Sequence, residues 1–156
     1  MTDATRWALD AITRTRRSLL AVADSVPRTA WREVPPGLSN NVLWNVGHVA
    51  VTAERLTYGL ARLDLPGPAW AHDAFRKGTS PADWATPPDV DATVALLDGF
   101  AERVEGDARA GRFASFRDYT TTPGVTLTSL DEAVAFDLYH EGLHLGSVLA
   151  LRKLVG

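Results

Sequence analysis

Hydrophobic residues recur at helical spacing in four long segments of the chain. In the first, apolar positions return every three or four residues from Ala8 to Val26, and Pro27 follows. This spacing, together with Pro and Gly between the segments, predicts helices over residues 3–26, 40–62, 89–108 and 129–154. The only β-prone pattern is a short stretch, residues 125–127, between the third and fourth predicted helices. We therefore predict an all-α fold, with a four-helix bundle as its architecture.

Two connections between the predicted helices are long. Residues 63–88 and residues 109–128 exceed what a tight helix hairpin needs. A long connection can cross the length of a bundle or cover a site, and the pattern alone allows both. A chain of 156 residues has the length of about one domain, so we expect a single domain over residues 1–156.

Composition and charge narrow the classes of function. Sixteen Lys and Arg against nineteen Asp and Glu give a net charge of −3, which lacks the basic surplus typical of nucleic-acid binding. The short basic run Arg14, Arg16 and Arg17 is expected on a solvated helix face. With no long apolar run and a polar N-terminus, the sequence predicts no membrane partner and a cytoplasmic location. The absence of cysteine excludes zinc fingers, disulfide frameworks and a cysteine nucleophile.

The candidate chemistry lies in four histidines. His140 and His144 are four residues apart on one helix face, with Cβ atoms roughly 5–6 Å apart, so both can reach one ion at about 2.0–2.1 Å. Their stripe is largely apolar, and His48 shares an inward stripe with Trp44 on the second helix. Inward histidines on two helices can form a metal site. The alternative for each is a hydrogen-bonded core histidine, while His72 is expected at the surface.

Two known metal signatures do not fit the last helix. Residues 140–144 match the H-E-x-x-H pattern of zinc proteases. The third ligand of such a site lies downstream, however, and none of the twelve residues after His144 is His, Asp or Glu. A di-iron bundle needs two Glu-x-x-His motifs, and the chain has only the one that begins at Glu141. We therefore favour neither a zinc protease nor a di-iron protein.

Residues beside the candidate ligands add to the pattern. Three glycines inside predicted helices lie within two residues of a candidate ligand: Gly47, Gly142 and Gly146. Each costs the helix about 0.8–1.0 kcal/mol relative to Ala, so we expect close approach of a neighbouring helix or a substrate there. Metal-bound imidazoles usually donate their second N–H to an oxygen. The candidates for that role are Asn45, Asp137 and Glu141.

Four stretches of the sequence resemble one family. Residues 39–48, SNNVLWNVGH, resemble the second-helix motif of the DinB-like (YfiT-like) superfamily. Residues 123–133, PGVTLTSLDEA, and residues 139–146, YHEGLHLG, resemble its last helix and the approach to it. Residues 75–80, FRKGTS, resemble the connection before its third helix. The similarity covers nearly the whole chain.

This resemblance implies a four-helix bundle with a crossover connection, often a homodimer. It also implies one divalent metal ion, zinc or nickel, held by His48, His140 and His144. Some relatives use a low-molecular-weight thiol such as bacillithiol or mycothiol as cosubstrate, and many have no established activity. Three protein ligands leave an open coordination position, as in catalytic zinc sites.

The resulting hypothesis is a metal-dependent enzyme that transfers a thiol to an electrophilic small molecule. Glu141, beside the first ligand of the last helix, is the predicted general base. Two alternatives stay open: a metal-dependent hydrolase, and a non-enzymatic stress-response protein that binds metal. Turnover with a thiol cosubstrate distinguishes the transferase from both.

Overall fold

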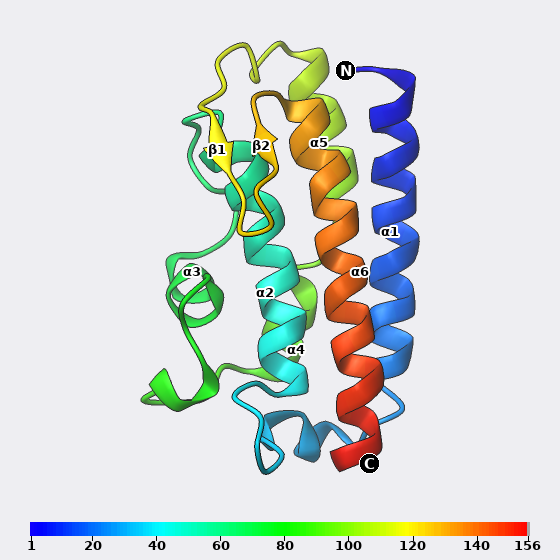
Figure 1. The fold of residues 1–156 in the computed structure, drawn as a ribbon, viewed down its shortest axis with the longest axis vertical. Coiled ribbons are helices and arrows are strands. Elements are labelled where there is room, and N and C mark those ends of the chain that lie inside the picture. Colours follow the sequence, from blue (N-terminus) through cyan, green and yellow to red (C-terminus); the bar gives the residue numbers. More distant parts are fainter. Residues whose placement is uncertain (156) are drawn as a thin grey trace.

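Helices that run the length of the molecule form a bundle, which confirms the all-α prediction (Figure 1). The computed structural model describes residues 1–155. Its elements are α1 (Asp3–Ala23), a 3-10 turn (Arg28–Arg32), α2 (Val42–Glu54), a π-helical turn (Arg55–Gly59), α3 (Ala69–Phe75), a 3-10 turn (Pro81–Asp83), α4 (Val90–Ala95), α5 (Phe100–Arg109), β1 (Tyr119–Thr120), β2 (Thr126–Leu127) and α6 (Leu130–Val155). No helix in this part of the chain combines the length and apolarity that crossing a membrane requires.

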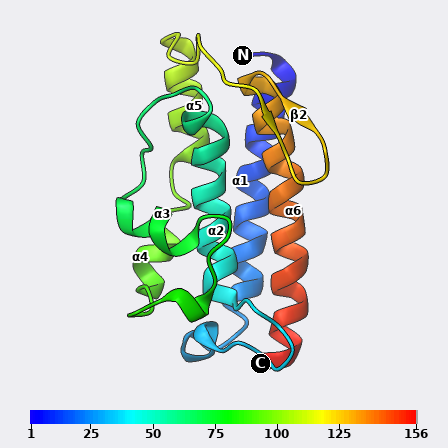
Figure 2. The same cartoon turned by 60° about the vertical axis from the view of Figure 1, so that its left-hand side comes forward.

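The connection between α2 and α4 crosses the length of the bundle. In Figure 1, α1 and α6 run downwards, whereas α2 and the α4–α5 pair both run upwards, and Figure 2 shows the same directions. The chain therefore has to return from the top of α2 to the bottom of α4, and α3 lies on this return path, packed against α2. Of the two possibilities that the length of the connection left open, the structure shows the crossover.

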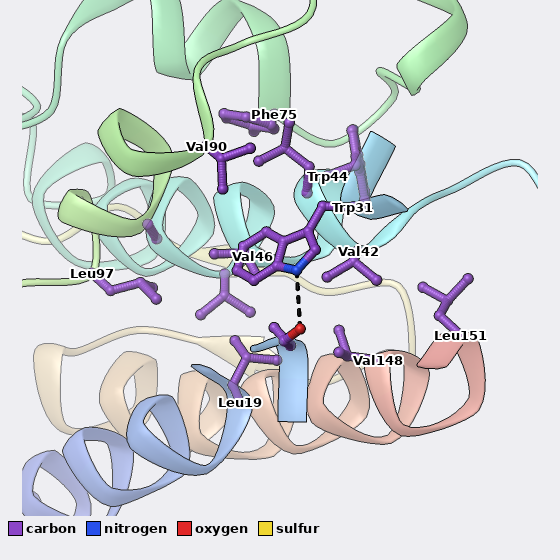
Figure 3. Packing of buried hydrophobic residues seen from close by; sticks show 14 of the residues in the cluster. Leu19, Trp31, Val42, Trp44, Val46, Phe75, Val90, Leu97, Val148 and Leu151 are labelled. Carbon is purple, nitrogen blue, oxygen red and sulfur yellow. Dashed lines mark hydrogen bonds between the residues drawn. The ribbon is translucent and has the colours of Figure 1, made fainter. Parts of the chain in front are cut away.

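A large apolar cluster joins α1, α2 and α6 at one end of the bundle. Trp31 is completely buried there, and its indole Nε1 donates a hydrogen bond to the carbonyl of Ala23 over 2.9 Å (Figure 3). Leu19, Val46 and Val148 pack around it from the three helices. Burying each large apolar side chain contributes about 1.5–3 kcal/mol, so this cluster fixes the three helices that position the histidines.

The predicted third helix is broken in the structure. It was expected to run without interruption over residues 89–108, but α4 ends at Ala95 and α5 begins at Phe100. Between them Gly99 has a φ of 66°, in the left-handed region that commonly ends a helix at glycine. The break leaves the carbonyl of Leu97 free of the helix ladder, and this oxygen accepts a hydrogen bond from Nη1 of Arg16 over 3.1 Å.

The second long connection forms a small hairpin instead of a plain loop. Residues Thr126–Leu127, within the β-prone stretch, pair antiparallel with Tyr119–Thr120. Figure 1 shows this hairpin beside the upper end of α2. It therefore covers the side of the bundle on which α2 ends.

A buried carboxylate ties the crossover connection to α2. Glu54 accepts a hydrogen bond from the backbone N–H of Gly67 over 2.8 Å, and its Oε2 lies 3.1 Å from Nε2 of His72. His72, expected at the surface, is thus buried, with 7% of its area exposed. Burial lowers the pKa of His72, while the charge of Glu54 opposes that shift.

Of the three glycines beside the candidate ligands, only Gly47 lies at a close approach. A Cβ at Gly47 would sit 2.5 Å from the ring of Phe75, the last residue of α3. At Gly142 and Gly146 a Cβ would meet nothing within 4 Å in the described part of the chain. The structure therefore shows the close approach of a neighbouring helix at Gly47 and none at the two glycines of α6, where close approach of a substrate stays a prediction.

Replacing Gly47 tests this close approach. Gly47→Ala should lower the free energy of unfolding by about 1–3 kcal/mol, because the new methyl group forces the Phe75 ring to move. Gly106→Ala, at an exposed position of α5 with open space around it, should instead raise it by up to about 1 kcal/mol. Urea denaturation of both variants measures the difference. Equal stability of Gly47→Ala and the parent protein would contradict the argument.

Candidate metal centre

The structure brings together three of the four histidines. His48 comes from α2, and His140 and His144 lie one turn apart on α6. Their candidate ligand atoms all lie within 4.8 Å of one another, and the Nε2 atoms of His140 and His144 are 3.1 Å apart. These are the three histidines expected to converge, and they could hold a metal ion. His72 lies outside the group.

Hydrogen bonds at Nδ1 fix the protonation of two of these rings. Nδ1 of His48 donates to the carbonyl of Phe75 over 2.6 Å, because a carbonyl can only accept. Nδ1 of His144 donates to Oδ1 of Asn45 over 2.8 Å. The amide nitrogen of Asn45 is itself bound to the carbonyl of Asn41, so its oxygen must face the histidine. Both rings therefore carry their proton on Nδ1 and an unprotonated Nε2.

The unprotonated nitrogens suit a shared cation. Because Nε2 of His144 has no proton, the contact with Nε2 of His140 is bridged either by a proton on His140 or by a cation that both rings share. Nε2 of His48 contacts only the hydroxyl of Thr52, at 3.2 Å. Three imidazole nitrogens form a donor set that zinc, nickel, copper and iron all accept. The residues present therefore fit a divalent metal.

Burial keeps the three imidazoles in the form that binds metal. Burial, together with the charge of neighbouring histidines in the cluster, lowers the pKa of His140 to about 4 and that of His144 to about 3. Burial also lowers the pKa of His48, although its bond to the carbonyl of Phe75 works in the opposite direction. All three rings are neutral at pH 7. Neutral imidazole is the form that ligates a metal, so binding requires no net loss of a proton, provided that His140 carries its proton on Nδ1.

The imidazole of His140 faces a buried carboxyl group. Asp137, one turn before His140 on α6, is completely buried, and its Oδ1 lies 3.9 Å from Nδ1 of His140. Within residues 1–155 neither of these atoms has a hydrogen-bond partner. Burial, reinforced by the charge of Glu141, raises the pKa of Asp137 well above its usual value. A small movement of the imidazole would bring the two groups into hydrogen-bond distance.

Glu141 does not lie where a general base is needed. Its side chain is completely buried. Its Oε1 accepts a hydrogen bond from Nε of Arg16 over 2.8 Å and lies 2.7 Å from Nη2 of the same guanidinium in an ion pair. Arg16, expected on a solvated face, is buried on α1 with its guanidinium over the ring of Phe100. A base must reach the proton that it removes, and Glu141 is absent from the lining of the pocket beside the histidines. The geometry therefore gives the predicted role of Glu141 no support.

A pocket of about 700 Å³ opens beside the histidines. His48 and His140 form part of its wall, so a molecule in the pocket can reach the metal-binding group. The end of α2 and its π-helical turn, the hairpin and α6 supply the other walls. A pocket of this size accommodates a small molecule.

The bond between Asn45 and His144 predicts a loss of metal affinity when Asn45 is replaced. Asn45→Leu should weaken metal binding by about 10–100-fold, because His144 loses the oxygen that orients its ring. Asn45→Asp keeps an acceptor oxygen at the same place, so its metal affinity should stay closer to that of the parent protein. Competition titration of Zn²⁺ against a chromophoric chelator measures both. Unchanged affinity in a folded Asn45→Leu protein would show that this bond does not support the site.

Comparison with known proteins agrees with the geometry. A family model described as the DinB superfamily matches residues 11–148, a range that includes His48, His140 and His144. No curated protein matches the chain. The match covers most of the chain, and the structure beneath it is a helical bundle with a three-histidine group that could bind metal. The protein therefore belongs to the DinB superfamily.

Proposed function

We propose that the protein is a metal-dependent enzyme that transfers a low-molecular-weight thiol to an electrophilic small molecule. In this proposal His48, His140 and His144 hold one divalent ion, zinc or nickel. The observation that carries the proposal is the convergence of three neutral imidazoles beside a pocket large enough for a small molecule. Imidazole alone does not select among zinc, nickel, copper and iron, so the choice of zinc or nickel follows the family resemblance.

The residues of the chain have two tasks in this mechanism. Phe75 and Asn45 hold two of the imidazoles with Nε2 directed into the group. The pocket walls bring the two reactants together and exclude water. Because the chain has no cysteine, the sulfur has to arrive on a cosubstrate. A metal ion with an open position, when bound, favours the thiolate over the thiol, whose pKa in water is near 8.5.

The lining of the pocket favours thiol transfer over hydrolysis. Among residues 1–155 no Asp or Glu lines it, and the one carboxylate considered as a base, Glu141, is held by Arg16. Without such a base, a thiol with a pKa of about 8.5 in water loses its proton more readily than water, whose pKa is about 15.7. The pocket itself supports an enzyme over the non-enzymatic stress-response protein, which needs no room for a substrate.

Two further features belong to the same proposal. The resemblance implies a homodimer, and α6 presents large apolar side chains to solvent outside the pocket, among them Leu149 and Leu154. Helix faces of this kind pack against a second copy in many dimers. The cytoplasmic location stays a prediction from the sequence.

Metal analysis of the protein, prepared without a His tag, tests the ligand set. The parent should hold one ion per chain, and His48→Ala should lose stoichiometric metal because two histidines remain. His72→Gln is the matched control, since His72 is also a buried histidine but lies outside the group, and it should keep its metal. Full metal retention in His48→Ala would place the site elsewhere.

A kinetic assay tests the reaction. Bacillithiol or mycothiol with 1-chloro-2,4-dinitrobenzene should react at an enzyme-dependent rate that is lost on chelation and restored by added Zn²⁺ or Ni²⁺. A rate that persists unchanged after complete metal removal would rule out the mechanism. If the metal-loaded protein shows no rate with any physiological thiol, the hydrolase or the non-catalytic protein becomes the better account.

A further inference from the structure

Three cationic side chains line the pocket beside the histidines. They are Arg55, Lys77 and Arg117, and no Asp or Glu of residues 1–155 shares the lining with them. The whole chain carries a net charge of −3. A pocket whose charged lining residues are all cations therefore differs in sign from the net charge of the molecule. A concave surface lined by charges of one sign focuses the electrostatic potential and attracts ions of the opposite sign.

These cations come from three separate segments. Arg55 begins the π-helical turn after α2, Lys77 follows α3 on the crossover connection, and Arg117 precedes β1. A solvated helix face would place its charges on one element, at helical spacing. Here the crossover connection and the hairpin both have to fold over the end of α2 before the three residues line one pocket.

The two arginines have no acidic partner within the described residues. Some exposed arginines outside the pocket, such as Arg14 and Arg109, pair with an acidic residue four positions away, whereas others, such as Arg76, make no ion pair with residues 1–155. Neither the guanidinium of Arg55 nor that of Arg117 makes an ion pair or a side-chain hydrogen bond with residues 1–155. Each therefore keeps its planar set of N–H donors, which matches a carboxylate or a phosphate, available to a ligand.

Backbone and side-chain contacts hold this arrangement in place. The backbone N–H of Arg117 donates to the carbonyl of Leu60 over 2.7 Å, which fixes Arg117 against the end of the π-helical turn. Nζ of Lys77 donates to Oγ1 of Thr122 over 2.8 Å and so joins the crossover connection to the hairpin. An ammonium group has three N–H donors, so two remain for a ligand.

Much of the rest of the wall is apolar. Leu56, Leu60 and Leu65 lie on one side of the pocket, and Phe136 and Leu143 come from α6. A ligand that fills this space therefore buries a hydrocarbon part as well as an anionic group. Pockets of this kind bind molecules through apolar area and use a few polar groups to set orientation.

We propose that the pocket binds a small organic anion, with its carboxylate or phosphate at Arg55, Lys77 and Arg117 and its apolar body against the leucines and Phe136. This places the remainder of the molecule next to His48 and His140. The inference rests on the proposed function, since it names the class of substrate that the metal site receives. It adds that the electrophile or the thiol carries a negative charge.

A matched pair of ligands tests the charge. Calorimetric titration of the full-length protein compares 4-phenylbutyrate with 4-phenylbutyramide, which has the same shape without the charge. The acid should bind at least about tenfold more tightly, a difference of about 1.4 kcal/mol. Both titrations are run on zinc-loaded and on metal-free protein. The preference for the acid should persist in the metal-free protein, because the three cations belong to the chain. In that protein no metal ion is present to bind the carboxylate, so metal binding cannot explain the preference.

Variants assign the preference to the named residues. Arg55→Gln and Arg117→Gln should each reduce the affinity for the acid towards that for the amide, while the amide binds as before and so reports an intact pocket. Arg152→Gln, at an exposed position of α6 outside the pocket, should change neither. Tighter binding of phenyl phosphate than of 4-phenylbutyrate would support a phosphate ester as the natural ligand, and the reverse order would support a carboxylic acid.

Three results would overturn the inference: equal binding of acid and amide, a preference that survives in the double variant Arg55→Gln/Arg117→Gln, or no measurable binding of any of these anions at millimolar concentration. The tests separate it from the proposed function. Preference for the acid together with an absence of thiol-dependent turnover would leave the anion pocket standing and count against the transferase alone.

Discussion

The site depends on the orientation of α6 about its own axis. A buried ion pair between α6 and α1 fixes this orientation. Glu141 lies next to His140 in the sequence, and its carboxylate is held by Arg16 of α1. If α6 turned away from this contact, His140 and His144 would turn with it and no longer face His48. Removing one partner of such a pair costs about 3–5 kcal/mol, so other rotations of α6 are strongly disfavoured.

The crossover connection contributes to the site as directly as the long helices do. It delivers α3, whose last residue, Phe75, packs on Gly47 and offers its backbone carbonyl to His48. Further along, it carries Lys77 to the pocket that opens beside the histidines. The bundle alone would bring the three imidazoles together. The connection orients one of them and forms part of the wall in front of it.

Sequence patterns predicted the bundle and the three histidines because both depend on helical periodicity, which is local. They missed Arg16, although it lies four residues after Ile12 and three before Leu19, on the buried stripe of α1. A charge on an apolar stripe indicates a buried ion pair, and Glu141 is its partner. The carbonyl of Phe75 could not be predicted, because every residue has one and only the tertiary fold selects which one faces a histidine.

The central claim is that His48, His140 and His144 share one metal ion with a coordination position left open to the pocket. Anomalous diffraction at the zinc edge, from crystals of the full chain grown with Zn²⁺, tests it most directly. The account predicts one peak per chain at about 2.0–2.1 Å from the Nε2 atoms of all three rings, with no fourth protein ligand. A peak held by other side chains, or an empty histidine group at saturating zinc, would contradict it.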